Sequence, residues 1–335
     1  MYEAAAYSGK WDRMKPPPGG SGAPLPAWAS ALQQAMAGHP GGGDIVWHGS
    51  LANYTTFNVG GRAEAIVFPR GREELSRLIR SLRGLDVPWV ILGRGSNVVI
   101  ADAGLKGVVI VLGRDFAEIE PVEDAADSIV VRVEAGCSLA KLVSWAVERG
   151  LAGLEFAAGI PGSVGGAIVM NAGAWQREMK DVLLRVGIMD GQGAVSAREV
   201  AAMHFAYRTW GEMQGAIALE GFFRLKKDNP AMLREMCKEY RQRRKMRQPQ
   251  NMASGGSFFK NPPGGKTAGQ LIDQAGLKGC LVGGAMVSLV HANFIVNTGR
   301  ATARDIIDLM GMVQKVVQEK YGIALEPEVK ILGLE

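Results

Sequence analysis

The sequence contains little cysteine and histidine and no long hydrophobic run. Its three cysteines, Cys137, Cys237 and Cys280, are widely spaced and never form C-x-x-C, so neither a disulfide framework nor a thiolate zinc site is indicated. None of the four histidines belongs to an H-E-x-x-H pair, and we expect no metal site. No apolar run approaches the about 18 residues of a membrane span, and the N-terminus lacks a signal-peptide core. We therefore expect a cytoplasmic protein without membrane contact.

The charge is unremarkable except in one segment. Charged residues make up 21% and hydrophobic residues 47% of the 335 residues, an ordinary balance for a soluble protein of two or three domains. The net charge is +5, and basic residues concentrate in RQRRKMR at 241–247. A solvated helix face, a site for an anionic small molecule such as a diphosphate, and a nucleic-acid patch would each explain them. Because no nucleic-acid motif accompanies the segment, nucleic acid is the least favoured partner.

The order of the expected elements indicates a mixed α+β chain. Residues 1–43 are rich in proline and glycine and are expected to form a flexible leader, with one short helix at 27–38. Hydrophobic patterns and caps then predict elements up to the C-terminus. Strands are expected at 63–68, 87–93, 107–113, 128–136, 216–225 and 328–333, and helices at 72–84, 138–150, 229–249 and 302–322. The composition shifts near residue 226, which predicts a domain boundary there.

Two glycine-rich stretches could bring backbone close to a phosphate. GRGSN at 93–97 follows a strand but has Val98 where a Rossmann fingerprint needs its third glycine. Its backbone N–H groups could still approach a phosphate, although an ordinary tight turn explains it equally well. GIPGSVGGAIVMNAGA at 159–174 has more glycine than a packing turn needs, which favours contact with a ligand. GGKT at 264–267 is not a P-loop, because Lys260 stands where the first glycine belongs.

A serine, an arginine and a glutamate lie in short stretches that mean little when each is taken alone. Ser257 in GGSFFKNP is not a hydrolase nucleophile, because Phe259 replaces the glycine that G-x-S-x-G requires. Arg208 in AYRTW would ordinarily be a surface salt-bridge partner. Glu328 in LEPEVKILG would ordinarily be a solvated carboxylate. These residues gain meaning only in combination.

Taken together and in order, these motifs resemble the UDP-N-acetylenolpyruvoylglucosamine reductase (MurB) family. The match runs from about residue 45 to 333 and includes NYTTFNVGG, GRGSN, GIPGSVGG, GGSFFKNP, AGQLIDQAGLKG, HANFIVN and LEPEVKILG. The resemblance implies an α+β FAD-binding domain of the vanillyl-alcohol-oxidase (PCMH) type at 44–225, in two subdomains at about 44–113 and 114–225. It also implies an α+β substrate-binding domain at 226–322 and a C-terminal strand segment at 323–335 that carries a catalytic glutamate.

The resemblance also implies a reaction. FAD, bound without a covalent link and reduced by NADPH, would pass hydride to UDP-N-acetylglucosamine enolpyruvate, giving UDP-N-acetylmuramate for peptidoglycan. By resemblance, Ser257 donates the proton, while Arg208 and Glu328 stabilise the substrate carboxylate. The two phenylalanines after Ser257 could exclude water from the reaction. The expected partner is a small nucleotide sugar, and the expected oligomeric state is a monomer.

The family motifs assign the remaining binding residues. The expected FAD contacts are Tyr54, Gly93, Arg94, Gly95, Ser96, Asn97, Gly159, Ile160, Pro161, Gly162, Ser163, Gly166, Asn171 and Gly173. The expected substrate contacts are Arg247, Asn261 and His291.

The chain departs from the family pattern in three places. Arg247 stands where a lysine is common, which keeps the charge but changes its geometry. Trp175 and Gln176 replace the usual tyrosine and glycine after NAGA, and the usual charged residues before His291 are missing. The short segment after Arg208 resembles the branch that lacks an inserted tyrosine-bearing loop.

Two other interpretations stay open at this stage. One is a different FAD-dependent oxidoreductase of the same superfamily, in which flavin is often tethered through histidine or cysteine. Neither residue occurs in GRGSN or GIPGSVGG. The other is a catalytically silent protein that binds nucleotide sugars.

Overall fold

The computed structural model describes residues 24–37, 43–211 and 215–334, and these residues form two compact units. Unit 1 comprises Met1–Gly49, Glu64–Arg94 and Gly107–Gln242. Unit 2 comprises Ser50–Ala63, Gly95–Lys106 and Arg243–Glu335. The chain therefore passes between the units several times, whereas the sequence suggests consecutive domains. The functional domain limits given above stay a prediction.

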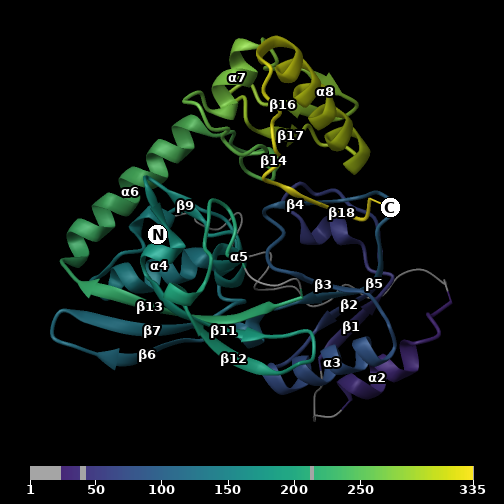
Figure 1. The fold of residues 1–335 in the computed structure, drawn as a ribbon, viewed down its shortest axis with the longest axis vertical. Coiled ribbons are helices and arrows are strands. Elements are labelled where there is room, and N and C mark those ends of the chain that lie inside the picture. The colour runs from purple at the N-terminus through teal and green to yellow at the C-terminus, as the bar shows by residue number, and fades with distance from the viewer. Residues whose placement is uncertain (1–23, 38–42, 212–214, 335) are drawn as a thin grey trace. The chain divides into compact units, whose positions relative to one another are not determined.

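A small sheet and two helices form one part of unit 1. The sheet has the order β1-β2-β5-β3, in which β1 and β2 are antiparallel and β3 and β5 parallel. Helix α3 forms because its apolar residues recur every three or four positions, so that one face is buried against the sheet. Helix α2 lies beside α3 (Figure 1). The bounds are α2 Ala29–Met36, β1 Asp44–Trp47, β2 Ala63–Phe68, α3 Arg72–Gly84, β3 Trp89–Leu92 and β5 Leu105–Val111.

The structure corrects the expectation of a flexible leader for residues 29–36. The short helix expected at 27–38 is present as α2, and its Leu32 and Met36 are buried in the same core as α3. Burial of these two side chains supplies the stabilisation that the surrounding proline and glycine cannot. Residues 1–23 and 38–42 lie outside the described residues.

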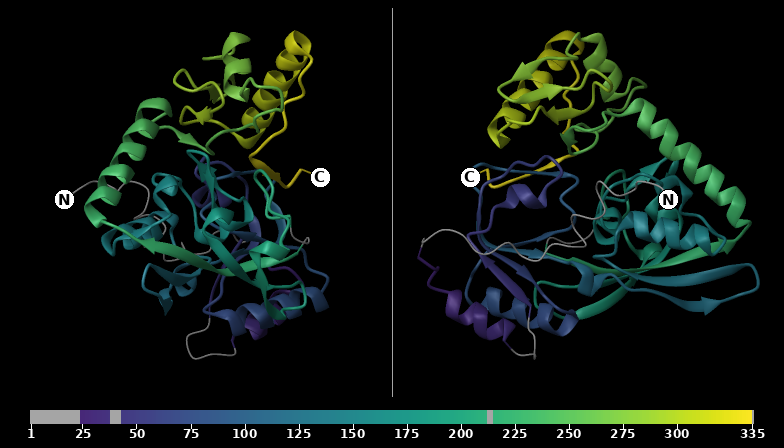
Figure 2. Two further views of the ribbon diagram at one scale, coloured as in Figure 1. Left: turned by 60° about the vertical axis from the view of Figure 1, so that its left-hand side comes forward. Right: turned by 180° about the vertical axis from the view of Figure 1, so that it is seen from behind.

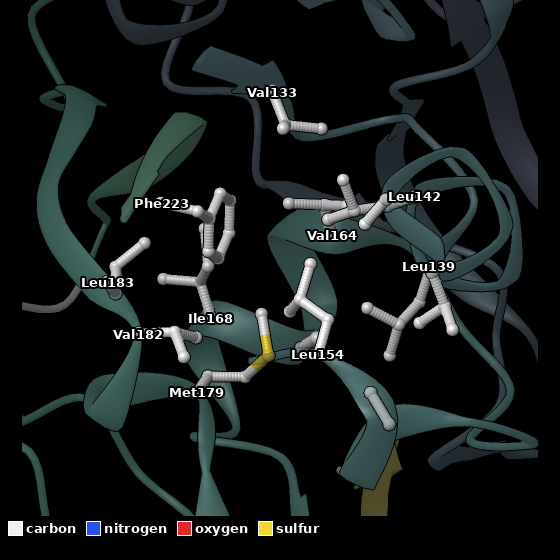
Figure 3. Packing of buried hydrophobic residues seen from close by; sticks show 14 of the residues in the cluster. Val133, Leu139, Leu142, Leu154, Val164, Ile168, Met179, Val182, Leu183 and Phe223 are labelled. Carbon is white, nitrogen blue, oxygen red and sulfur yellow. The ribbon is translucent and has the colours of Figure 1, made fainter. Parts of the chain in front are cut away.

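The larger part of unit 1 is a sheet of order β12-β11-β13-β7-β6, with β8 paired to β13. All its described strand pairs are antiparallel. Helices α4 and α5 bury their apolar residues against this sheet, around Phe223, Ile168 and Leu142 (Figure 3). The bounds are β6 Ile119–Asp124, β7 Ser128–Glu134, α4 Leu139–Glu148, β8 Leu151–Ala152, α5 Val164–Val169, β9 Gly173–Ala174, β10 Arg177–Glu178, β11 Leu183–Met189, β12 Val195–Glu199 and β13 Ile217–Lys227.

A buried carboxylate links helix α3 to the larger sheet within unit 1. Glu220 on β13 is only 6% exposed, and Arg132 on β7 donates to it over 3.0 Å. Arg72, the first residue of α3, also binds Glu220 with both terminal nitrogens of its guanidinium group. Burial acts to lower the pKa of Arg132, but its hydrogen bonds to Glu220, Glu120 and Glu118 outweigh this and raise it, so the guanidinium group stays charged. This pairing compensates the cost of burying Glu220 and fixes where α3 meets the sheet.

Unit 2 is built around two helices that cover a four-stranded sheet (Figure 2). The sheet has the order β14-β17-β16-β15 and is antiparallel, and a separate parallel pair joins β4 to β18. Helix α7 begins with a capping box between Thr267 and Gln270, which explains the GGKT stretch without any nucleotide. The bounds are β4 Val98–Ile100, β14 Ala253–Ser254, α7 Ala268–Gln274, β15 Leu281–Val282, β16 Ala285–Val287, β17 Ile295–Asn297, α8 Ala303–Tyr321 and β18 Lys330–Leu332.

Helix α6, Pro230–Arg247, contains the boundary between the units, which falls after Gln242. Most of its basic residues are exposed, in agreement with a solvated helix face. Among the residues that the structure describes, no helix is both long enough and apolar enough to cross a membrane.

Candidate active site

In unit 1, Gly93 of the first glycine-rich stretch meets Ser163 of the second. Gly93, at the end of β3, faces the side chain of Ser163, and a Cβ atom at Gly93 would lie 2.6 Å from Ser163 Oγ. Only glycine allows this approach. Ser163 is itself buried and caps α5, accepting a hydrogen bond from Gly166 N over 3.3 Å. The structure thus brings together two stretches that the sequence separates by about 65 residues.

The rest of the GIPGSVGG stretch is shaped by backbone that only glycine adopts easily. Gly159 and Gly162 have φ of 83° and 138°. Between them Ile160 packs against the core of unit 1, whereas Pro161 is exposed. Exposed Gly166 and half-buried Gly173 lie at the start of α5 and just after its end.

The second glycine of GRGSN lies in unit 2, against the backbone of Tyr54. Gly95 has φ 60°, and a Cβ atom there would lie 1.9 Å from the Tyr54 carbonyl oxygen. Gly95 also accepts a hydrogen bond from Thr56 N over 3.0 Å. Tyr54 is almost fully buried, and burial raises the pKa of its phenol above the ordinary value. Arg94 and Ser96 flank Gly95 and are half-buried.

Arg208 occupies a tight turn of unit 1. Ala206 and Thr209 bind each other's backbone in both directions, over 2.9 and 3.2 Å, and Tyr207 and Arg208 form the tip. Arg208 has φ 61°, an uncommon value for an arginine. Its guanidinium group lies 4.7 Å from the centre of the Tyr207 ring, a cation–π contact.

Ser257 lies in unit 2 at the start of a firmly anchored segment. It is half-buried and follows Gly256, which has φ 83°. The two phenylalanines after it are buried in the core of unit 2, beside Phe57. They anchor the segment, and the water-excluding role expected from the sequence stays a prediction.

Asn293 holds this segment in place, a role that the sequence motifs did not predict. It is 4% exposed. Its side-chain amide donates to Phe259 O over 2.8 Å and accepts from Phe259 N over 3.0 Å. Its backbone carbonyl accepts from Phe258 N over 2.7 Å. The signal available in the sequence was its place in HANFIVN, two residues after His291.

The structure brings Ser257 and Glu328 onto neighbouring segments of unit 2. Glu328 N donates to Phe258 O over 2.8 Å, one residue beyond the serine. The side chain of Asn97 donates to the Glu328 carbonyl over 3.1 Å, and Lys330 N donates back to Asn97 O. The end of GRGSN is thus attached to the glutamate expected to be catalytic.

The expected substrate contacts also lie in unit 2. His291 accepts a hydrogen bond at Nδ1 from Asn293 N over 3.2 Å, and burial lowers the pKa of its imidazole, so it is neutral at pH 7. Asn261 is exposed and accepts from Ala268 N over 3.1 Å. Arg247 is exposed at the C-terminal end of α6.

Comparison with known proteins places the chain in a family. The model of the UDP-N-acetylenolpyruvoylglucosamine reductase C-terminal domain matches residues 248–332, and that of an FAD binding domain matches residues 63–197. A UDP-N-acetylenolpyruvoylglucosamine reductase from Caldanaerobacter subterraneus is 41% identical over 293 residues, 87% of this chain and 94% of that protein. The chain belongs to the UDP-N-acetylenolpyruvoylglucosamine reductase family.

Two further members of the UDP-N-acetylenolpyruvoylglucosamine reductase family agree with this. The relative from Symbiobacterium thermophilum is 45% identical over 285 residues, 84% of this chain and 90% of that protein. The crystal structure of the Thermus caldophilus reductase (MurB) superposes with a TM-score of 0.72 at 37% identity, covering 87% of this chain and 99% of that one. The chain is thus an FAD-dependent oxidoreductase whose FAD-binding domain is followed by the C-terminal domain of this family.

The residues present fit FAD. The matched FAD-binding region contains both Gly93 and Ser163, whose approach leaves no room for a Cβ atom. Backbone without a side chain, as at Gly93, is what lets a bound diphosphate approach closely. Of the residues expected to be catalytic, Arg208 belongs to unit 1, whereas Ser257 and Glu328 belong to unit 2.

Proposed function

We propose that this chain catalyses the NADPH-dependent reduction of UDP-N-acetylglucosamine enolpyruvate to UDP-N-acetylmuramate, with Arg208, Ser257 and Glu328 as the groups that act on the substrate. The reaction follows from membership of the family. The assignment of residues rests mainly on one observation, the backbone hydrogen bond that joins Glu328 to Phe258 beside Ser257.

FAD, once bound and reduced by NADPH, would supply a hydride to the terminal methylene carbon of the enolpyruvyl group. The carbon–carbon double bond then opens toward the substrate carboxylate, which takes up negative charge. In this proposal the Arg208 guanidinium stabilises that charge by pairing with the carboxylate. Glu328 shares a proton with the same carboxylate, because two ionised carboxylates side by side would repel each other.

Ser257 completes the reduction in this proposal. Its hydroxyl proton passes to the carbon next to the carboxylate, so that one hydride and one proton are added across the double bond. A serine hydroxyl is a weak acid, but the carbon that receives the proton is strongly basic at that moment. The fixed backbone after Ser257 supports the assignment, since a proton donor must be held within hydrogen-bond reach of its target.

The remaining assignments concern binding. Arg247 offers a positive charge for the substrate diphosphate, and Asn261 and neutral His291 offer hydrogen bonds. Tyr54, Arg94, Ser96, Asn97 and the residues of GIPGSVGG are proposed to hold FAD. We further propose that the protein works as a cytoplasmic monomer; light scattering of the purified protein tests the oligomeric state.

The change Ser257→Ala tests the proton donor. Reduction of the flavin by NADPH should stay within about threefold of wild type. Reoxidation by the enolpyruvyl sugar should slow by roughly 10²–10⁴-fold, the usual contribution of a positioned acid. Stopped-flow absorbance of the flavin, without oxygen, measures both steps. Ser254→Ala, three residues upstream, is the matched control and should change neither. Equal loss in both half-reactions for Ser257→Ala would contradict the assignment.

A further inference from the structure

Asn171 is a buried amide in unit 1 whose hydrogen bonds all go to the protein. It has no exposed surface, and its φ of 39° is a conformation that asparagine tolerates better than most residues. Its Nδ2 group donates to Glu178 Oε2 over 2.9 Å and to Ala206 O over 3.1 Å. Its Oδ1 atom accepts from Lys180 N over 3.2 Å. Both amide hydrogens are therefore used within the protein.

One of these bonds reaches the turn that carries Arg208. Ala206, whose carbonyl receives the amide hydrogen, is the first of the four turn residues, and Arg208 is the third. Of the two central residues of the turn, Tyr207 and Arg208, only Arg208 has a positive φ, as in a type II turn. The third position of such a turn favours glycine. An arginine in this conformation stays there only if the surrounding structure holds it.

A second bond holds the other end of the same turn. Trp210 N donates to Val169 O, the last residue of α5, over 3.1 Å, and Trp210 is buried. Asn171 follows α5 by two residues, so both bonds come from the segment that ends this helix. The turn of Arg208 is thus attached at both ends to the C-terminal end of α5 and the residues just after it, and Ser163 of the glycine-rich stretch caps the start of the same helix.

We propose that Asn171 is a positioning residue that fixes the Arg208 turn for the substrate carboxylate, rather than a residue that donates hydrogen bonds to the flavin. The inference rests on the proposed role of Arg208. It differs from the contact with FAD expected from the sequence, because the side chain has no amide hydrogen left for a further acceptor. The proposal explains why an amide, which can donate twice and accept, is buried at this position.

The change Asn171→Asp isolates the donor function. Aspartate has the same shape, tolerates the same backbone conformation and can still accept from Lys180 N. It cannot donate to Ala206 O, and its charge would repel Glu178. Asn229→Asp is the matched control, because exposed Asn229 accepts from Ala231 N over 2.8 Å through its Oδ1 atom, a bond that aspartate can keep. Asn171→Ser, which is uncharged and too short to keep both bonds, makes the same test if the aspartate does not fold.

Five measurements on the full chain separate positioning from the alternatives. Reoxidation by the enolpyruvyl sugar should slow by roughly 10–100-fold, the effect of misplacing a catalytic group by about 1 Å. The dissociation constant for FAD, measured by fluorescence, and reduction by NADPH should stay within about threefold of wild type. The amide hydrogens of Thr209, which closes the Arg208 turn, and of Trp210, which attaches the turn to α5, should exchange faster. Adding Arg208→Ala to Asn171→Asp should slow reoxidation no further than Arg208→Ala alone.

Results that would contradict the role of Asn171 differ from results that would contradict the proposed function. A dissociation constant for FAD raised more than about tenfold, with normal reoxidation at saturating FAD, would make Asn171 a flavin ligand and overturn the proposal. Reoxidation at the wild-type rate, or equal loss in both half-reactions, would overturn it too. If the sugar does not reoxidise the wild-type flavin, or Arg208→Ala has no effect, the proposed function itself fails and this inference with it.

Discussion

The most informative single change for the structure of the site is Asn293→Ala. It removes the two side-chain hydrogen bonds, of 2.8 and 3.0 Å, that pair Asn293 with the backbone of Phe259. Both partners are buried, so no water replaces them. Each of the two buried groups left without a partner costs about 1–3 kcal/mol, so the free energy of unfolding should fall by about 2–6 kcal/mol. The backbone bond from Phe258 N to Asn293 O remains, so the segment is loosened but not released.

The effect should appear in stability and in chemistry. Urea denaturation followed by far-ultraviolet circular dichroism measures the loss, and anaerobic reoxidation by the enolpyruvyl sugar should slow because Ser257 directly precedes the loosened segment. Asn229→Ala is the control: it removes one exposed helix-capping bond, should cost about 1 kcal/mol, and should leave reoxidation unchanged. A loss below about 1 kcal/mol for Asn293→Ala, with normal reoxidation, would refute the view that this asparagine holds the catalytic segment.

Two further predictions concern stability. Burial lowers the pKa of His291, so the unfolded chain takes up a proton at this residue more readily than the folded chain does. The contribution of His291 to stability is therefore fully present above about pH 6.5 and is lost as the pH falls below about 6.5. The difference in unfolding free energy between wild type and His291→Gln should therefore narrow between pH 7 and pH 5 in urea denaturation, and a constant difference would contradict the assignment. Trp175 and Gln176 form a two-residue hairpin loop between β9 and β10 with φ of 56° and 62°, a turn that favours glycine at its second position. Gln176→Gly should thus raise Tm by roughly 1–3 °C in a calorimetric scan, whereas a lower Tm would show that Gln176 makes contacts worth more than the strain.

The sequence predicted most of the elements, because they carry local signals. Residues 63–68 and 72–84 are a strand and a helix, as expected from their hydrophobic patterns. The final helix has both the expected capping box at Thr302 and the left-handed Gly322 at its end. The membership of the family and the FAD-binding domain were likewise predicted from the motifs and are confirmed.

The contacts that hold the site could not be predicted in this way. Asn293 and Asn171 act through hydrogen bonds to residues 34 and 35 positions away, and no local pattern records such a pairing. The packing of α2 against α3 was not predicted for a related reason. The surrounding proline and glycine indicate a flexible segment, and only Leu32 and Met36 signal that the helix is buried. The assignment of Gly93 to unit 1 and of Gly95 to unit 2 also depends on contacts that the sequence does not show.

The roles of Ser257, Arg208 and Glu328 remain predictions, and one anaerobic titration tests the function on which they depend. The purified protein is reduced with NADPH until the flavin absorbance is bleached, and UDP-N-acetylglucosamine enolpyruvate is then added without oxygen. Our account predicts rapid return of the oxidised flavin spectrum, with one sugar consumed for each flavin. A flavin that bleaches but is reoxidised only by air would contradict the proposed substrate. A protein that takes up no FAD would contradict the proposed flavin-dependent reaction altogether.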